Sequence, residues 1–142
     1  MSGKRYYSTV GDVLRYTGIK PKDLGFKDAE EEGGITADEL LTAFIEARLI
    51  EVKDLIDRDR NRDFHAEGDV PPGIHHIALR IMKNFLAHAV VSRETPIVRV
   101  DDFTIRMVED QVFTHAIRND LRTYPAKPRF RILRISSGRG AG

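Results

Sequence analysis

The chain has 142 residues, the length of one domain, and 41% of them are hydrophobic, which is enough for a core. It has no cysteine, which excludes disulfides and thiolate zinc sites. No apolar run approaches the roughly 20 residues that span a bilayer, so we expect no membrane span. Residues 1–7 lack the apolar stretch of a secretory signal, so we expect none. The net charge of +1 hides an asymmetry, because residues 118–142 carry seven Lys or Arg and one Asp (net +6), whereas residues 1–117 carry 16 basic and 21 acidic side chains (net −5).

The first part of the chain predicts one short helix and a loop. Ser8 or Thr9 is placed to cap a helix over about 9–17. Residues 20–35 are polar and rich in Glu and Gly, which is typical of a loop. We expect two apolar residues to pin this loop to the core, Leu24 and Phe26.

A long amphipathic helix is predicted over 36–60. Thr36 and Glu39 form a capping box, in which the Thr36 hydroxyl accepts from the amide of Glu39 and the Glu39 carboxylate accepts from the amide of Thr36. The apolar residues that follow recur every three or four positions and form one stripe. They are Leu40, Leu41, Phe44, Ile45, Leu49, Val52, Leu55 and Ile56.

A second amphipathic helix is predicted over 72–91, where Pro71 or Pro72 supplies the φ of a first turn. Its apolar face comprises Ile74, Ile77, Ala78, Ile81, Met82, Phe85, Leu86, Ala89 and Val90. Its polar face comprises His75, His76, Arg80, Lys83, Asn84 and His88. Because the link between the two helices is short, we expect them to form a long antiparallel pair.

The last third predicts a small β-hairpin, a helix and an extended segment. Two β-prone runs around Asp101-Asp102 predict a hairpin over 97–107. A helix is predicted over 108–124, with its apolar side formed by Val108, Val112, Phe113, Ala116, Ile117 and Leu121. The near-alternation of charged and apolar residues over 129–135 predicts a strand or an extended arm.

These elements together predict a mainly α fold. The core is a small helical bundle built on the long antiparallel pair, with a small β-hairpin and an extended C-terminal arm. We expect a helical domain over 1–126 and a basic arm over 127–142.

Two patterns resemble metal sites and fail on spacing. Asp57, Asp59, Asn61 and Asp63 alternate as in the start of a calcium loop, but the sixth position is arginine instead of glycine and the twelfth is glycine instead of glutamate. A solvated helix end with local ion pairs is the simpler interpretation.

The histidines of the second long helix are also poor metal ligands. Adjacent His75 and His76 point about 100° apart on a helix, and His88 lies three turns beyond His76. We therefore predict polar-face histidines and no metal site. A contact with a neighbouring subunit is the alternative role.

The sequence contains no nucleophile motif, no P-loop and no Rossmann glycine pattern. No histidine–carboxylate spacing indicates a general acid and base. We therefore expect a protein that is not an enzyme and that has no cofactor.

The basic arm is the candidate interaction site, through Arg129, Phe130, Arg131, Ile132, Arg134 and Ile135. The arginines could bind phosphates while Phe130 stacks on a base. Alternatively, the apolar residues bury against a protein and the arginines meet its acids. A solvated edge strand is the third interpretation. The alternation with Ile132 and Ile135 favours docking on a protein, because a purely DNA-binding tail would not need them.

The order of several short motifs resembles one known family. The chain has Tyr7-Ser8-Thr9-Val10-Gly11-Asp12-Val13 at its start, Ile56-Asp57 at the end of the first long helix, Arg62-Asp63-Phe64 in the following loop, and Val70-Pro71-Pro72 before the next helix. This pattern, over residues 7–90, resembles the head-completion or head-tail connector adaptor proteins of tailed viruses. The acidic loop at 27–34 and the hairpin at 97–107 are not part of that pattern.

The resemblance implies a structural protein of the virion neck, assembled in the host cytoplasm. Such a subunit forms a ring, commonly twelve-fold, beneath the portal protein, and presents a surface to the next neck or tail protein. DNA passes through the channel without sequence-specific binding. The resemblance also implies portal docking by the C-terminal segment, here the arm at 127–142. The competing class is a small nucleic-acid-binding or regulatory helical module that uses the same basic tail.

Overall fold

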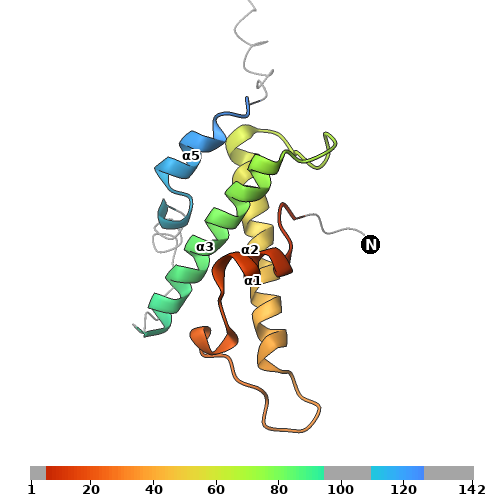
Figure 1. Cartoon of the computed structure of the whole chain (residues 1–142), viewed down its shortest axis with the longest axis vertical. Helices are drawn as coiled ribbons and strands as arrows, with labels where there is room; N and C mark the ends of the chain where they lie inside the picture. The colour runs from red at the N-terminus through yellow and green to blue at the C-terminus, as the bar shows by residue number, and fades with distance from the viewer. Residues whose placement is uncertain (1–5, 95–109, 127–142) are drawn as a thin grey trace, which may run out of the picture.

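The computed structural model describes residues 6–94 and 110–126. Within these ranges the elements are α1 (Val10–Thr17), the 3-10 helix η1 (Pro21–Leu24), α2 (Ala37–Arg60), α3 (Pro72–Glu94) and α5 (His115–Leu121). The described part of the chain contains no strand, so the predicted mainly α class is confirmed (Figure 1). The predicted hairpin at 97–107 and the predicted arm at 127–142 lie outside the described residues.

Helix α2 begins and ends as its sequence dictates. The Thr36 hydroxyl accepts from the amide of Glu39 at 3.1 Å, and the amide of Thr36 donates to Glu39 Oε1 at 2.9 Å, so the predicted capping box is confirmed. Asn61 ends the helix in the left-handed region at φ 53°, a conformation that asparagine tolerates better than most residues.

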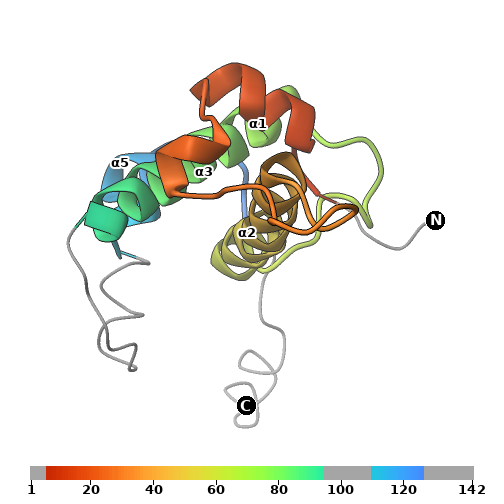
Figure 2. The same ribbon diagram turned by 90° about the horizontal axis from the view of Figure 1, so that it is seen from below.

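Helices α2 and α3 are the longest elements, and they pack against each other across the centre of the molecule (Figures 1 and 2). The core between them, with α1 and α5, is built from aliphatic residues at helical spacing. The predicted apolar stripes supply most of it, although Leu40, Phe44, Ala89 and Val90 are only partly buried and Leu79 was not predicted. The fully buried members include Ile45, Leu49, Ile56, Ile74, Ile81, Met82 and Leu86.

The segment before α2 contains more structure than the sequence predicted. Thr9 caps α1 by accepting from the amide of Asp12 at 3.0 Å, as expected. However, the predicted loop at 20–35 includes a turn of 3-10 helix, η1, with Pro21 at its first position. The expected contacts of Leu24 and Phe26 are confirmed, because both pack against the core.

The prediction of one continuous helix over 108–124 is wrong. Residues 110–112 are helical, the chain bends at Phe113, and Thr114 then caps α5 by accepting from the amide of Ile117 at 3.3 Å. The bend allows Val112, Phe113, Ile117 and Leu121 to be buried together, whereas the predicted core residue Ala116 is exposed. Asn84 of α3 fixes the bend, since its Nδ2 donates to the Val112 carbonyl at 3.0 Å.

No helix in the described ranges is both long enough and apolar enough to cross a bilayer.

Candidate functional site

Within the described residues, a polar cluster lies where the N-terminal segment meets the turn after α2. Tyr7 is buried, with 3% of its surface exposed. Its hydroxyl donates to Asp57 Oδ1 at 2.5 Å and accepts from the amide of Phe64 at 2.9 Å. Burial, followed by the hydrogen bond to Asp57, raises the pKa of the Tyr7 phenol well above its usual value. Tyr7 therefore stays a neutral donor that joins the two segments.

Lys53 Nζ lies 5.3 Å from the Tyr7 ring centroid and bridges two carboxylates. Its Nζ is 2.5 Å from Asp57 Oδ2 and 3.1 Å from Asp63 Oδ2. Burial alone would lower the pKa of Lys53, but its hydrogen bonds to Asp57 and Asp63 outweigh that effect and raise it. For Asp63, burial favours a higher pKa, and the bond from Lys53 with the amides of Ala66 and His65 reverses this and lowers it.

These contacts explain the alternating acidic residues of the sequence. Asp57 binds Tyr7 and Lys53, Asp59 pairs with Arg60 at 3.0 Å, Asn61 caps α2, and Asp63 accepts from the amides of His65 and Ala66. In residues 6–94 and 110–126, no group of three His, Asp or Glu side chains is placed to hold a metal ion.

Two histidines also bind the N-terminal segment. His75 Nδ1 lies 2.9 Å from the Tyr7 carbonyl, and His65 Nε2 lies 2.7 Å from the Tyr6 carbonyl. A carbonyl only accepts, so each of these nitrogens carries the hydrogen. The His65 ring also stacks on Tyr7, with centroids 5.0 Å apart and an interplanar angle of 11°. The sequence placed His75 on a polar face and gave no sign of this role.

The same turn also binds the end of the described chain. Arg60 Nη1 donates to the Tyr124 carbonyl at 3.1 Å, and Arg62 Nη1 donates to the Pro125 carbonyl at 2.8 Å. The Tyr124 ring meets Phe64 edge-on, with centroids 5.9 Å apart. The Arg62 guanidinium lies over the same Phe64 ring, 4.3 Å from its centroid.

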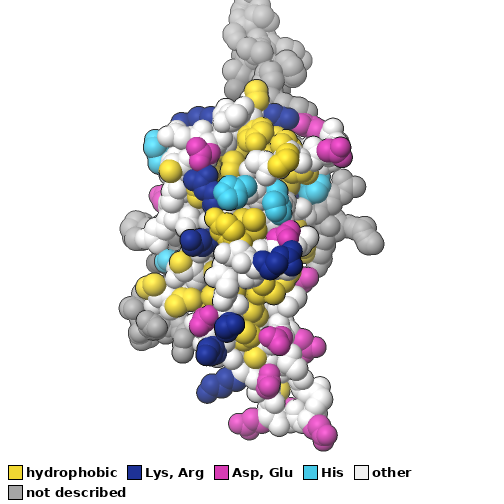
Figure 3. All heavy atoms as spheres, in the orientation of Figure 1, with side chains coloured by type: hydrophobic (Ala, Val, Ile, Leu, Met, Phe, Trp, Pro, Cys, Tyr) yellow, Lys and Arg dark blue, Asp and Glu magenta, His cyan; other side chains and the backbone are white. Residues whose placement is uncertain are grey.

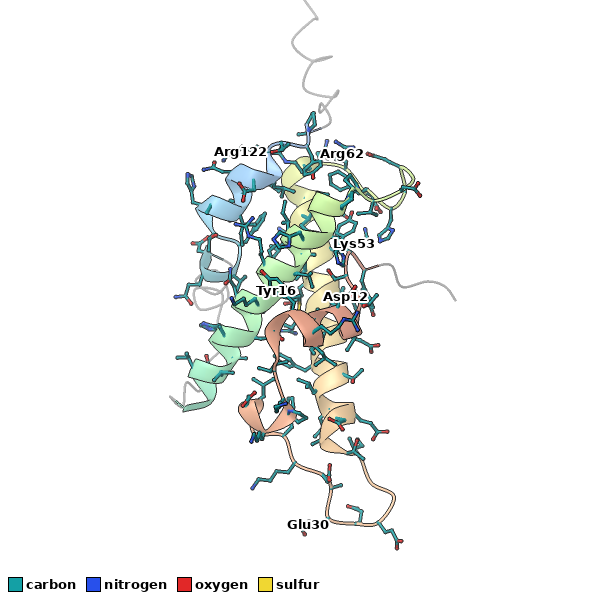
Figure 4. The ribbon with its side chains drawn as sticks, viewed as in Figure 1. Asp12, Tyr16, Glu30, Lys53, Arg62 and Arg122 are labelled. Atoms are coloured by element: carbon teal, nitrogen blue, oxygen red, sulfur yellow. The ribbon has the colours of Figure 1, made fainter. Side chains whose placement is uncertain are left out.

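We call this set of residues the terminal junction: Tyr6, Tyr7, Lys53, Asp57, Arg60, Arg62, Asp63, Phe64, His65, His75 and Tyr124. Figure 4 shows Lys53 and Arg62 in the half of the molecule where α2 ends and where the described chain leaves α5. Phe64 is the central residue, because its ring contacts both Tyr7 and Tyr124 edge-on. The junction therefore ties both ends of the described chain to one turn.

The chemistry of the junction is that of a structural joint. Its carboxylates, lysine and phenol bind one another, and its two histidines hold backbone carbonyls. A shallow hollow elsewhere, on α2, is lined by Asp38, Glu39, Thr42, Ala43 and Glu46, a set with no histidine or strong nucleophile. Beside the junction, the buried Ser8 hydroxyl lies 3.5 Å from His75 Nδ1, but that nitrogen donates its hydrogen to the Tyr7 carbonyl and so is not a base for Ser8.

The predicted docking residues Arg129, Phe130, Arg131, Ile132, Arg134 and Ile135 lie outside the described residues. The structure instead describes the place where their segment begins, at Pro125 beside Arg62. The junction residues were not predicted as a site. The sequence signal for them was the order of Tyr7, Ile56-Asp57 and Arg62-Asp63-Phe64.

Comparisons of the chain with protein-family models, with curated protein sequences and with solved structures found no match.

Proposed function

We propose that this chain is a structural adaptor of a tailed-virus neck. It forms a ring, commonly twelve-fold, beneath the portal protein and extends the DNA channel. The ring presents a surface to the next neck or tail protein. In this proposal α2 and α3 form the antiparallel pair at the centre of each subunit.

One observation carries the proposal. Three of the four short motifs that give the resemblance are far apart in the sequence, yet they meet in the terminal junction. Tyr7 of the first motif bonds to Asp57 of the second and to the amide of Phe64 of the third. Val70, from the fourth motif, packs against the same core. Motif residues that contact one another in the structure support the resemblance to the connector adaptors better than residues that match at unconnected positions.

The junction also supports the proposed role of the arm. Arg60 and Arg62 hold the backbone at Tyr124 and Pro125, immediately before the arm at 127–142. A docking segment binds more tightly when its first residues are already held in place, because less conformational entropy is lost on binding. We propose that residues 129–135 dock on the portal from this fixed point.

Deletion of residues 127–142 tests this role. We expect the truncated protein to keep its helical circular dichroism, because the core formed by the described residues is left in place, and to lose co-purification with the portal protein encoded in the same genome. Deletion of 136–142 alone is the matched control, since it keeps the proposed docking residues and should keep portal binding. Portal binding by the longer deletion would contradict the docking role.

A further inference from the structure

One exposed face of the molecule is acidic with an apolar centre. The side of α2 that points away from its buried stripe carries Ala43, Ala47 and Ile50, all exposed, and Ile50 exposes 52% of its surface. Four carboxylates surround them, those of Glu39, Glu46, Glu51 and Asp54. Arg58 pairs with Asp54 at 2.8 Å and Arg48 with Glu51 at 3.4 Å, so the negative charge is strongest around Glu39 and Glu46. We call these residues the acidic face.

A second exposed face is basic and also has apolar residues at its centre. Tyr16 of α1 and Val91 of α3 expose 39% and 61% of their surfaces. Lys20, Lys22 and Lys83 are exposed on the elements around them, and Lys83 Nζ lies 5.9 Å from the Tyr16 ring centroid. Arg15 and Arg80 add positive charge, although each pairs with an aspartate of its own molecule, Asp12 and Asp120. We call these residues the basic face.

The two faces cannot cover each other within one molecule. The buried side of α2 packs against α1, α3 and η1, so its acidic face points away from the elements that carry the basic face. Figure 2 shows α1 and α3 on one side of α2. In Figure 3 basic side chains are spread over the left, centre and top of the visible surface, and acidic ones gather at the lower right, over the start of α2 and the loop that precedes it.

We propose that the acidic face of one copy packs on the basic face of the next copy. Apolar residues on both faces would be buried, and carboxylates would meet lysines around them. The contact is head-to-tail, because each copy uses two different surfaces, and such contacts close into rings when the rotation permits. This inference rests on the proposed adaptor ring and names the surfaces that build it.

Single-cysteine cross-linking tests the inference, because the natural chain has no cysteine and each variant then has one thiol. We expect a mixture of Ile50→Cys and Val91→Cys proteins to form a covalent dimer with a short bis-maleimide. Each variant alone should give little dimer, since the two thiols would then sit on non-facing surfaces. Ala116→Cys, an exposed position on α5, is the matched control for either partner.

The dependence of the dimer yield on salt tests whether charge pairs hold the two faces together. The mixed dimer should decrease as salt rises from about 0.05 to 0.5 M, because exposed charge pairs are screened. Lys83→Glu in the Val91→Cys protein should reduce the yield at low salt. Equal dimer in each single variant, or none in the mixture while the protein still forms rings, would overturn the inference and leave the adaptor function standing. Failure of the unmodified protein to form rings would count against the adaptor function itself.

Discussion

At the scale of single residues, Tyr7 connects the N-terminal segment to both α2 and the turn that follows it. Its hydroxyl joins Asp57 of α2 to the amide of Phe64, and its ring contacts both Phe64 and His65. A buried hydroxyl that both donates and accepts is hard to replace, because its partners are left without bonds when it is removed.

Tyr7→Phe should therefore lower the free energy of unfolding by about 1–3 kcal/mol, since the buried Phe64 amide loses its acceptor. Urea unfolding followed by circular dichroism measures the change. Tyr16→Phe is the matched control, because the Tyr16 side chain is exposed, and it should alter stability by less than about 0.5 kcal/mol. Equal stability of the two variants would show that the Tyr7 hydroxyl does not fasten the N-terminal segment.

The sequence revealed some of these residues and concealed others. The Thr36–Glu39 box was predictable because both partners lie within one helical turn and the rule is local. The bonds from His65 and His75 to the carbonyls of Tyr6 and Tyr7 join residues 59 and 68 positions apart. No local pattern encodes such contacts, so the terminal junction could be suspected only through the order of its motifs.

At the scale of elements, α3 and the segment after α5 meet at Gly73. A Cβ on Gly73 would collide with the Tyr124 hydroxyl and lie 3.1 Å from Tyr124 Cζ. A residue with a Cβ does not fit at this position of the first turn of α3, because the Tyr124 side chain lies against the backbone there. Arg60 Nη1 donates to the Tyr124 carbonyl and so holds the backbone of the same residue.

The effect of Gly73→Ala on the free energy of unfolding should depend on which residue occupies position 124. In the natural chain we expect a loss of about 1–3 kcal/mol, because the new methyl displaces Tyr124. In a Tyr124→Leu background the collision is removed, and the higher helix propensity of alanine should make the same change neutral or stabilising by up to about 1 kcal/mol. A double-mutant cycle by urea unfolding measures the coupling. Additive effects would contradict this contact.

Two elements show where sequence patterns stop being sufficient. The pattern over 108–124 fits one helix, but Asn84 binds the Val112 carbonyl and Thr114 begins a new helix, so a tertiary contact and a cap override the periodicity. Conversely, η1 is a single short turn, and the polar composition of 20–35 concealed it. The long helices were predictable because their apolar spacing extends over many turns.

At the scale of the whole molecule, the described chain begins and ends at one turn. Tyr6 and Tyr7 contact the turn through His65 and Phe64, and Tyr124 and Pro125 contact it through Arg60 and Arg62. The acidic and basic faces lie on other parts of the surface. In the proposed ring, this arrangement leaves separate surfaces for the proposed neighbouring copies and for the proposed partner of the arm.

Electron microscopy of the purified protein, alone and after co-expression with the portal protein of the same genome, tests the adaptor function most directly. The adaptor function predicts closed rings of this chain stacked coaxially on the portal, and no appreciable affinity for DNA. Protein that stays monomeric beside the portal, and that binds DNA with an affinity falling steeply as salt rises, would contradict it and identify a nucleic-acid-binding module instead.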